Sequence, residues 1–149
     1  MMKNLFQILC GLFLVVSYSS CMHSEEDKVD VLIIGGGASG VTSGIQSARM
    51  GANTLILEES TWLGGMLTSA GVSAVDGNYR LPAGLWGEFK NRLSDYYGGL
   101  DSLKTGWVSN VLFEPSVGNK ILHEMVAAEN NLKVWKQACL EEVKRTGDE

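Results

Sequence analysis

The apolar and polar positions along the chain predict strands at residues 31–34, 54–57 and 131–135. The first two runs, VLII and TLIL, lack polar alternation, which is typical of strands that are buried on both faces of a parallel sheet. In the third run, NLKVW, Leu132 and Val134 alternate with other residues. We interpret this run as the next parallel strand.

Apolar residues at helical spacing predict three helices between these strands. The first helix follows residues 35–40 and runs to about Met50, the second covers 85–97, and the third begins at Pro115. Residues 100–114 show no clear pattern and are interpreted as an insertion loop. The apolar stripes consist of Val41, Ile45 and Ala48; Leu85, Phe89 and Leu93; and Ile121, Leu122, Met125 and Val126.

The turn GGGASG joins the first strand to the first helix and fits G-x-G-x-x-G. In such a turn the first glycine permits a sharp reversal, the second leaves room for a pyrophosphate, and the third lets helix and strand pack closely. The start of the helix offers free backbone N–H groups and the positive end of its dipole to an anion. The sequence therefore predicts a phosphate-binding turn made of Gly35, Gly36, Gly37, Ala38, Ser39 and Gly40.

An acidic residue follows the second predicted strand. Glu58 lies 18 residues after Gly40, where a doubly wound fold places the acid that accepts hydrogen bonds from a ribose. A carboxylate at this point also repels a 2′-phosphate, which disfavours NADP. The alternative is that Glu58 simply ends a strand in solvent. The order of strand, glycine turn, helix, strand and acid favours the ribose-binding role of Glu58.

Composition narrows the classes of partner. An apolar fraction of 45% and a charged fraction of 19% are those of a globular protein. The net charge of −5, without a basic run, argues against a nucleic-acid partner. His23 and His123 lie too far apart in sequence to supply metal-ligand spacing, and we expect no metal site. We expect Cys139 to be a small buried apolar residue.

The first residues have the layout of a targeting segment. Residues 1–21 contain one cation, Lys3, then an apolar run too short to span a bilayer comfortably, and predict a secretory signal peptide. The segment ends in SSC, similar to the lipobox of bacterial lipoproteins, although Tyr18 stands where that pattern prefers an aliphatic residue. We expect Cys21 to be acylated. An unmodified signal peptide and an uncleaved anchor are the alternatives.

Acylation of Cys21 would place the protein at a membrane of the bacterial cell envelope, after export through the general secretory route. Residues 22–29, MHSEEDKV, are polar and acidic and are interpreted as a short tether. Residues 30–149 then form the predicted folded part.

Two motifs resemble a known family. DVLIIGGGASGVTSGIQSARMGANTLILEES and WLGGMLTSAGVSAVDGN are similar to segments of the FAD-dependent oxidoreductases with a glutathione-reductase-type FAD domain, above all of their exported bacterial lipoprotein members. The resemblance implies that Gly64, Gly65 and Met66 lie beside the pyrophosphate and ribityl chain of FAD, with backbone N–H groups facing phosphate oxygens. An ordinary turn is the alternative. A plain NAD domain usually lacks this second glycine pair, so the resemblance favours FAD.

The resemblance implies a fold and an activity. The expected fold is an α/β, Rossmann-like FAD-binding domain with a parallel sheet, of which the chain holds the N-terminal part, and residues 137–149 would supply the first strand of a β-meander. The expected function is the FAD-binding portion of a flavin-dependent oxidoreductase that acts on an unknown small molecule. No catalytic residue is identified. The alternative is a truncated, non-catalytic fragment or a lipid-anchored nucleotide-binding module.

Overall fold

The computed structural model describes residues 28–107 and 109–147. The elements, in chain order, are β1 (Val31–Ile34), α2 (Ala38–Arg49), β2 (Thr54–Glu58), the 3₁₀ turn η1 (Gly65–Leu67), β3 (Ala74–Val75), α3 (Gly84–Tyr97), the 3₁₀ turn η2 (Leu100–Leu103), β4 (Val111–Leu112), α4 (Pro115–Ala127) and β5 (Leu132–Lys136).

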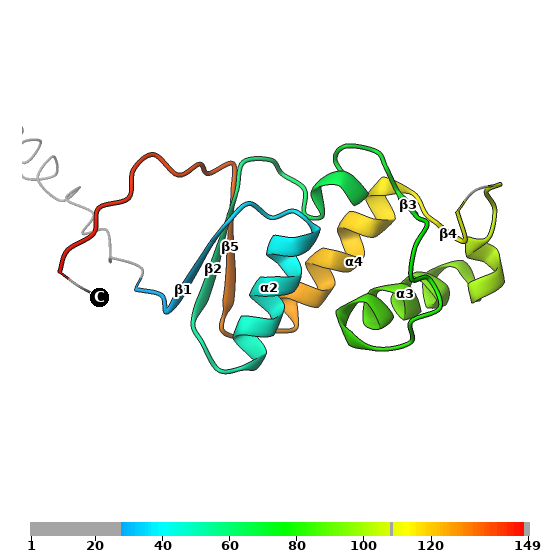
Figure 1. Ribbon diagram of the computed structural model, residues 1–149, viewed down its shortest axis with the longest axis horizontal. Coiled ribbons are helices and arrows are strands. Elements are labelled where there is room, and N and C mark those ends of the chain that lie inside the picture. Colours follow the sequence, from blue (N-terminus) through cyan, green and yellow to red (C-terminus); the bar gives the residue numbers. More distant parts are fainter. Residues whose placement is uncertain (1–27, 108, 148–149) are drawn as a thin grey trace, which may run out of the picture.

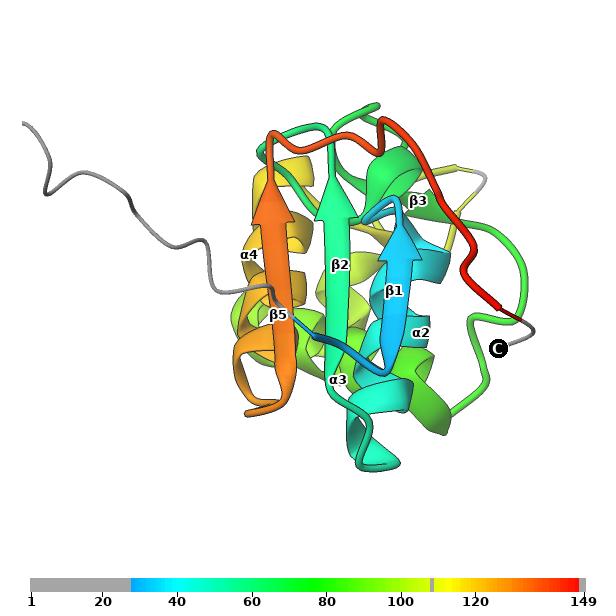
Figure 2. The ribbon, with the colours of Figure 1, turned by 90° about the vertical axis from the view of Figure 1, so that its left-hand side faces the viewer.

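A three-stranded parallel sheet in the order β1-β2-β5 forms one layer of the molecule. Figure 2 shows the three strands side by side, with β2 in the middle and the helices behind them. Because all three strands run in the same direction, their carboxyl ends meet at one edge of the sheet. The predicted α/β fold with a parallel sheet is confirmed.

Helices α2 and α4 cover one face of this sheet, and α3 lies beyond them (Figure 1). The contact between α2 and β2 is close, since a Cβ built on Gly44 would lie 2.7 Å from Cδ1 of Ile56. The predicted apolar stripes of α2 and α4 are buried completely in the core that these layers enclose, and of the α3 stripe Phe89 and Leu93 are buried. The largest fully buried apolar side chains are Ile45, Ile56, Leu63, Leu93, Leu103, Met125 and Val41.

The other face of the sheet carries no helix in the described part of the chain (Figure 2). On this face Leu32 and Ile34 of β1 are 47% and 53% exposed, and Trp135 of β5 is 45% exposed. The prediction that residues 31–34 are buried on both faces is therefore wrong, whereas β2 keeps both Leu55 and Ile56 buried. An apolar run indicates that both faces tolerate burial, but tertiary packing decides which face is covered.

The segment between α3 and α4 has more structure than its sequence suggested. It contains η2 and β4, and β4 pairs with β3 in a short antiparallel ladder. In contrast, residues 138–147 form no strand in the described chain, so the expected first strand of a β-meander is not present there. This segment instead crosses the carboxyl edge of the sheet (Figure 2). The Ala138 N–H donates to the carbonyl of Glu58 at 3.1 Å.

The predicted signal peptide, Cys21 and residues 22–27 of the predicted tether lie outside the described residues. Within the described part of the chain, none of the helices has the length and apolar character needed to cross a bilayer.

Candidate functional site

The turn between β1 and α2 lies at the carboxyl edge of the sheet, where open α/β sheets bind ligands. Gly35 has a φ of +95°, a left-handed conformation that favours glycine. Its N–H donates to the carbonyl of Leu57 at 2.8 Å, so the turn begins as a continuation of the sheet. Helix α2 then starts after Gly37, whose carbonyl accepts the Val41 N–H at 2.9 Å.

Gly40 and Gly37 have opposite surroundings. A Cβ on Gly40 would lie 1.9 Å from the carbonyl oxygen of Gly35, so the helix crosses the end of β1 with no space for a side chain. A Cβ on Gly37 would meet no heavy atom within 4 Å. Gly37 also has an ordinary φ of −64°. Neither packing nor backbone conformation within the described protein therefore requires glycine at position 37.

Open backbone amides lie beside Gly37. No hydrogen bond within the described chain engages the N–H groups of Ser39 and Gly40 in the first turn of α2, because the first N–H groups of a helix have no intrahelical partner. Gly37 makes no side-chain cap, and the first turn carries no acidic residue. The positive end of this 12-residue helix is thus open to an anion.

The carboxylate of Glu58 reaches back to the glycine turn. Its Oε2 accepts the Gly36 N–H at 2.6 Å, and its Oε1 accepts the Ser60 N–H at 2.8 Å. Partial burial raises the pKa of this carboxyl, but hydrogen bonds from Ser60 and Gly36 outweigh burial and hold the pKa below its usual value. The sequence predicted a ligand role for this carboxylate and missed its contact with Gly36.

Gly36 differs from its neighbours because its backbone groups are used within the protein. Its N–H is bound by Glu58, and its carbonyl accepts the Gly64 N–H at 2.8 Å. A Cβ on Gly36 would lie 2.8 Å from Cδ2 of Leu63. Within the predicted turn, Gly36 therefore uses its backbone groups to hold the turn in shape. Ser39 and Gly40 instead leave their N–H groups open to a ligand.

The structure brings the second glycine pair directly beside the first turn. Gly37 and Gly64 form a parallel bridge, and a Cβ on Gly65 would lie 3.2 Å from Cα of Gly37. Gly64 and Gly65 both have left-handed backbones, with φ of +106° and +52°. No described residue accepts a hydrogen bond from the N–H of Gly65 or Met66. Two turns with open amides thus lie side by side.

Side chains from distant segments hold this second turn through the buried residue Leu63. Oδ1 of Asn119, on α4, accepts the Leu63 N–H at 2.9 Å. The hydroxyl of Thr68 donates to the carbonyl of Leu63. The sequence analysis missed Asn119, and no local signal could have found it, since 56 residues separate it from Leu63.

A small pocket of about 220 Å³ adjoins the turn at the ends of β1 and β2. Gly35, Glu58 and Glu59 form part of its wall, and residues 138–140 close the opposite part. Cys139 belongs to that wall and is exposed, so the expectation that it is buried is wrong. The segment after β5 runs over the sheet edge and does not enter the core. The pocket is smaller than sites for whole drug-sized ligands, which suits one end of an elongated molecule.

Metal ligands are not gathered in the described part of the chain, where no group of three His, Cys, Asp or Glu side chains could hold an ion. The expectation of no metal site remains a prediction for the whole chain. The site is instead formed by open amides, glycines without side chains and one ionised carboxylate. This donor set fits the diphosphate and ribose of a dinucleotide.

Comparison with known proteins agrees with this chemistry. The family described as FAD dependent oxidoreductase matches residues 30–149. No significant match is found among curated proteins. Similar solved structures include p-nitrophenol 4-monooxygenase PnpA from Pseudomonas putida, with 15% identity, a TM-score of 0.46, and coverage of 79% of this chain and 34% of that chain.

THI4 from Thermovibrio ammonificans is also similar, with 15% identity, a TM-score of 0.39, and coverage of 91% of this chain and 46% of that chain. The chain therefore spans less than half the length of either structure. The family match runs from the start of β1 past the end of β5 and includes both glycine turns. The chain belongs to the FAD-dependent oxidoreductase family, and its cofactor is FAD.

Proposed function

We propose that the two glycine turns hold the pyrophosphate of FAD, as the cofactor-binding portion of a flavin oxidoreductase. The observation that carries this proposal is the open space beside Gly37, next to the unengaged amides of Ser39 and Gly40. The unengaged amides of Gly65 and Met66 belong to the second turn, which lies beside Gly37. Backbone amides at a helix start are suited to a diphosphate because they supply donors and a positive field together.

The adenosine end of FAD would lie beside Glu58. Each carboxylate oxygen has two acceptor positions, and Gly36 and Ser60 occupy one on each oxygen. We assign the ribose hydroxyls to the acceptor positions of Glu58 that the protein leaves open. The pocket of about 220 Å³ next to Glu58 would then receive the adenine ring.

The role of the described residues in the reaction is to bind and orient the cofactor. When bound, FAD supplies hydride-transfer chemistry through its isoalloxazine ring. The turn at Gly64 and Gly65 would hold the part of the cofactor next to the pyrophosphate, and Asn119 and Thr68 hold that turn through Leu63. The reaction partner is proposed to be a small molecule, and no residue of this chain is assigned a catalytic role.

An absorption spectrum of the purified chain tests the proposal. We expect flavin bands at close to one FAD per chain, and bleaching of these bands when an electron donor is added. Titration of the flavin-free chain with riboflavin, which lacks the ADP half of FAD, should give no saturable binding. Binding of riboflavin as tight as that of FAD would contradict the assignment of the glycine turns.

A module that binds the nucleotide without turnover is the second candidate. Such a module would work together with another protein, and the uncovered apolar sheet face formed by Leu32, Ile34 and Trp135 supplies a surface on which that protein could dock. Bound flavin that no donor reduces would support the module. Reduction followed by reoxidation with an acceptor would support the enzyme.

We also propose that Cys21 carries a lipid and anchors the protein to a membrane of the bacterial envelope. The pattern of Lys3, the apolar run and SSC supports this proposal. Mass spectrometry of the protein isolated from bacterial membranes should find a diacylglyceryl group on Cys21. Cys21→Ser should remove the group and release the protein from the membrane fraction, and an unmodified Cys21 in membrane-bound protein would contradict the proposal.

A further inference from the structure

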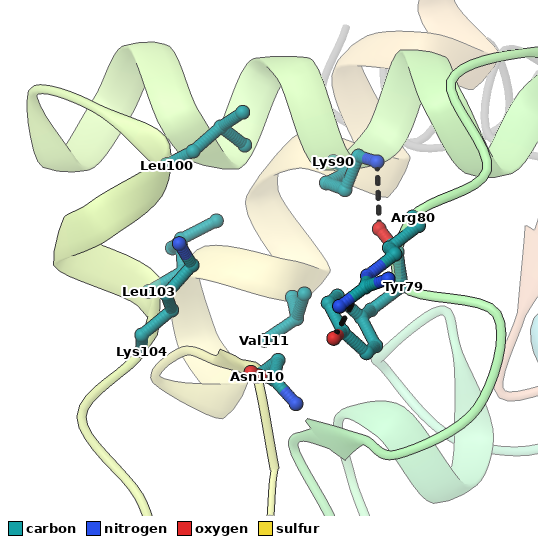
Figure 3. A pocket seen from close by; sticks show the side chains of 8 residues that line it. All are labelled: Tyr79, Arg80, Lys90, Leu100, Leu103, Lys104, Asn110 and Val111. Carbon is teal, nitrogen blue, oxygen red and sulfur yellow. Dashed lines mark hydrogen bonds between the residues drawn. The ribbon is translucent and has the colours of Figure 1, made fainter.

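We propose that a second cavity of this protein binds a small organic carboxylate. The cavity has a volume of about 510 Å³ and lies between the segment at Tyr79 and Arg80, helix α3, η2 and the start of β4 (Figure 3). Its described lining shares no residue with the two glycine turns or with the pocket beside Glu58. The inference therefore goes beyond FAD binding and does not depend on it.

The main observation is a buried lysine. Lys90 of α3 lines the cavity and is only 7% exposed. Its Nζ donates to the carbonyls of Tyr79 and Leu81, both at 2.8 Å. An ammonium has three donors, so one remains. No carboxylate of the described residues forms an ion pair with Lys90.

A buried charge normally has a partner of opposite charge, because the interior solvates it poorly. The ring of Trp86, with its centroid 5.9 Å from the Lys90 Nζ, supplies only a weak substitute. The missing negative charge is thus expected to come from a molecule in the cavity.

A second cation is fixed at the same place. The Nε of Arg80 donates to the hydroxyl of Tyr79 at 3.0 Å, and the guanidinium lies over the Tyr79 ring at 5.4 Å from its centroid. This arrangement leaves the two terminal amino groups of Arg80 without a partner in the described chain. Since Lys90 and Arg80 both bind Tyr79, they present donors from one side of the cavity (Figure 3). A guanidinium with both amino groups free matches the two oxygens of a carboxylate.

The rest of the lining selects an organic ligand. No Asp or Glu occurs among the described lining residues. Lys104, a further cation of the lining, is paired with Asp101 at 2.8 Å and needs no ligand charge. Leu100, Leu103 and Val111 form apolar wall, with the two leucines facing the cations across the cavity (Figure 3). The volume falls in the range of small-molecule sites. An organic molecule with a carboxylate group and an apolar body matches both the cations and the apolar wall of the cavity.

Isothermal titration of the full chain with phenylacetate tests the proposal. We expect one saturable site per chain, with the same affinity in the presence and absence of FAD. The neutral analogue phenylacetamide should bind at least about tenfold more weakly, because it cannot neutralise the cations. Equal binding of the acid and the amide would overturn the proposal, as would the absence of saturable binding.

Three variants locate the site. Arg80→Gln and Lys90→Met should each weaken phenylacetate binding by about tenfold or more. The matched control is Arg92→Gln, which removes a cation from the same helix at a residue outside the cavity lining and should leave the affinity unchanged. Arg80 is exposed, so Arg80→Gln tests the site even if Lys90→Met does not fold. An unchanged affinity in Arg80→Gln, or an equal loss in Arg92→Gln, would overturn the proposal.

Inorganic phosphate separates an organic site from a general anion site. We expect phosphate to compete with phenylacetate only weakly, because phosphate leaves the apolar wall of Leu100, Leu103 and Val111 uncovered. Phosphate that binds as tightly as phenylacetate would overturn the assignment of an organic ligand. In an NMR titration, phenylacetate should shift the methyl signals of these three residues, and shifts confined to other residues would contradict the location.

Discussion

Glu58 is the last residue of β2, and its carboxylate connects this strand to the glycine turn. The same carboxylate supports the turn and remains open to a ligand. The hydrogen bonds to Gly36 and Ser60 fix its orientation. Its position after the second strand could be predicted from the sequence by counting from the glycine turn. The bond to Gly36 could not, because it depends on the register between β1 and β2 and on the direction of one side chain.

Glu58→Gln tests the ribose contact. Glutamine keeps the size of the side chain but removes the charge and one acceptor, so FAD binding should weaken by about 1–3 kcal/mol, the usual cost of a lost charge-assisted hydrogen bond. Fluorescence titration measures the affinity. Asp95→Asn, an equal change of charge at an exposed residue of α3, is the control and should bind FAD as the wild type does. Wild-type affinity in Glu58→Gln would contradict the contact.

The same carboxylate predicts a pH dependence of folding. The pKa of Glu58 is lower in the folded chain than its ordinary value, so its ionised form stabilises the fold above the unfolded pKa of about 4.3. This stabilisation is lost as the pH falls through the lower, folded pKa. Urea unfolding at several pH values should therefore show a constant difference between wild type and Glu58→Gln from neutral pH to about 5, and a shrinking difference below about pH 4. A difference that grows toward acid would contradict the direction of the shift.

At the scale of elements, the site depends on three segments that come together at one edge of the sheet. The start of α2 and the 3₁₀ turn η1 present the amides, and α4 holds η1 through Asn119. The helices and strands could be predicted because their apolar spacing is local. The covered face of β1, the β3–β4 ladder and the role of Asn119 could not, since each depends on residues distant in sequence.

Asn119→Ala removes the acceptor for a buried backbone N–H. The Leu63 amide would then lie unpaired in the core, which should lower the free energy of unfolding by about 1–3 kcal/mol. Asn119→Asp keeps an acceptor oxygen at this position and should recover most of the loss. Urea denaturation of the two variants measures the difference. Equal stability of Asn119→Ala and the wild type would show that the bond does not hold the turn.

Gly40→Ala tests the packing of α2 on β1. The added Cβ would lie 1.9 Å from the carbonyl oxygen of Gly35, a backbone atom that cannot rotate away. We expect the free energy of unfolding to fall by about 3 kcal/mol or more, at the upper end for overpacked positions. Circular dichroism during urea unfolding measures this loss. A variant as stable as the wild type would contradict the close approach.

At the scale of the whole molecule, the packing of the helices on the sheet places two glycines with different surroundings one helical turn apart. Gly40 is tightly packed, and Gly37 is not. The sheet and helices fix Gly40 against Gly35, whereas Gly37 faces open space. Packing therefore explains the glycine at position 40, whereas no described residue requires a glycine at position 37. We propose that the glycine at position 37 serves the cofactor, in a family whose members bind FAD.

The most direct test is the FAD affinity of Gly37→Ala, measured by fluorescence titration beside Gly77→Ala. Both glycines have open surroundings and neither has a left-handed backbone, so both variants should keep their stability within about 1 kcal/mol. The methyl group at position 37 would enter the space assigned to the pyrophosphate and should weaken FAD binding by about 1–3 kcal/mol, whereas Gly77→Ala should bind normally. A folded Gly37→Ala chain with wild-type affinity for FAD would contradict the account.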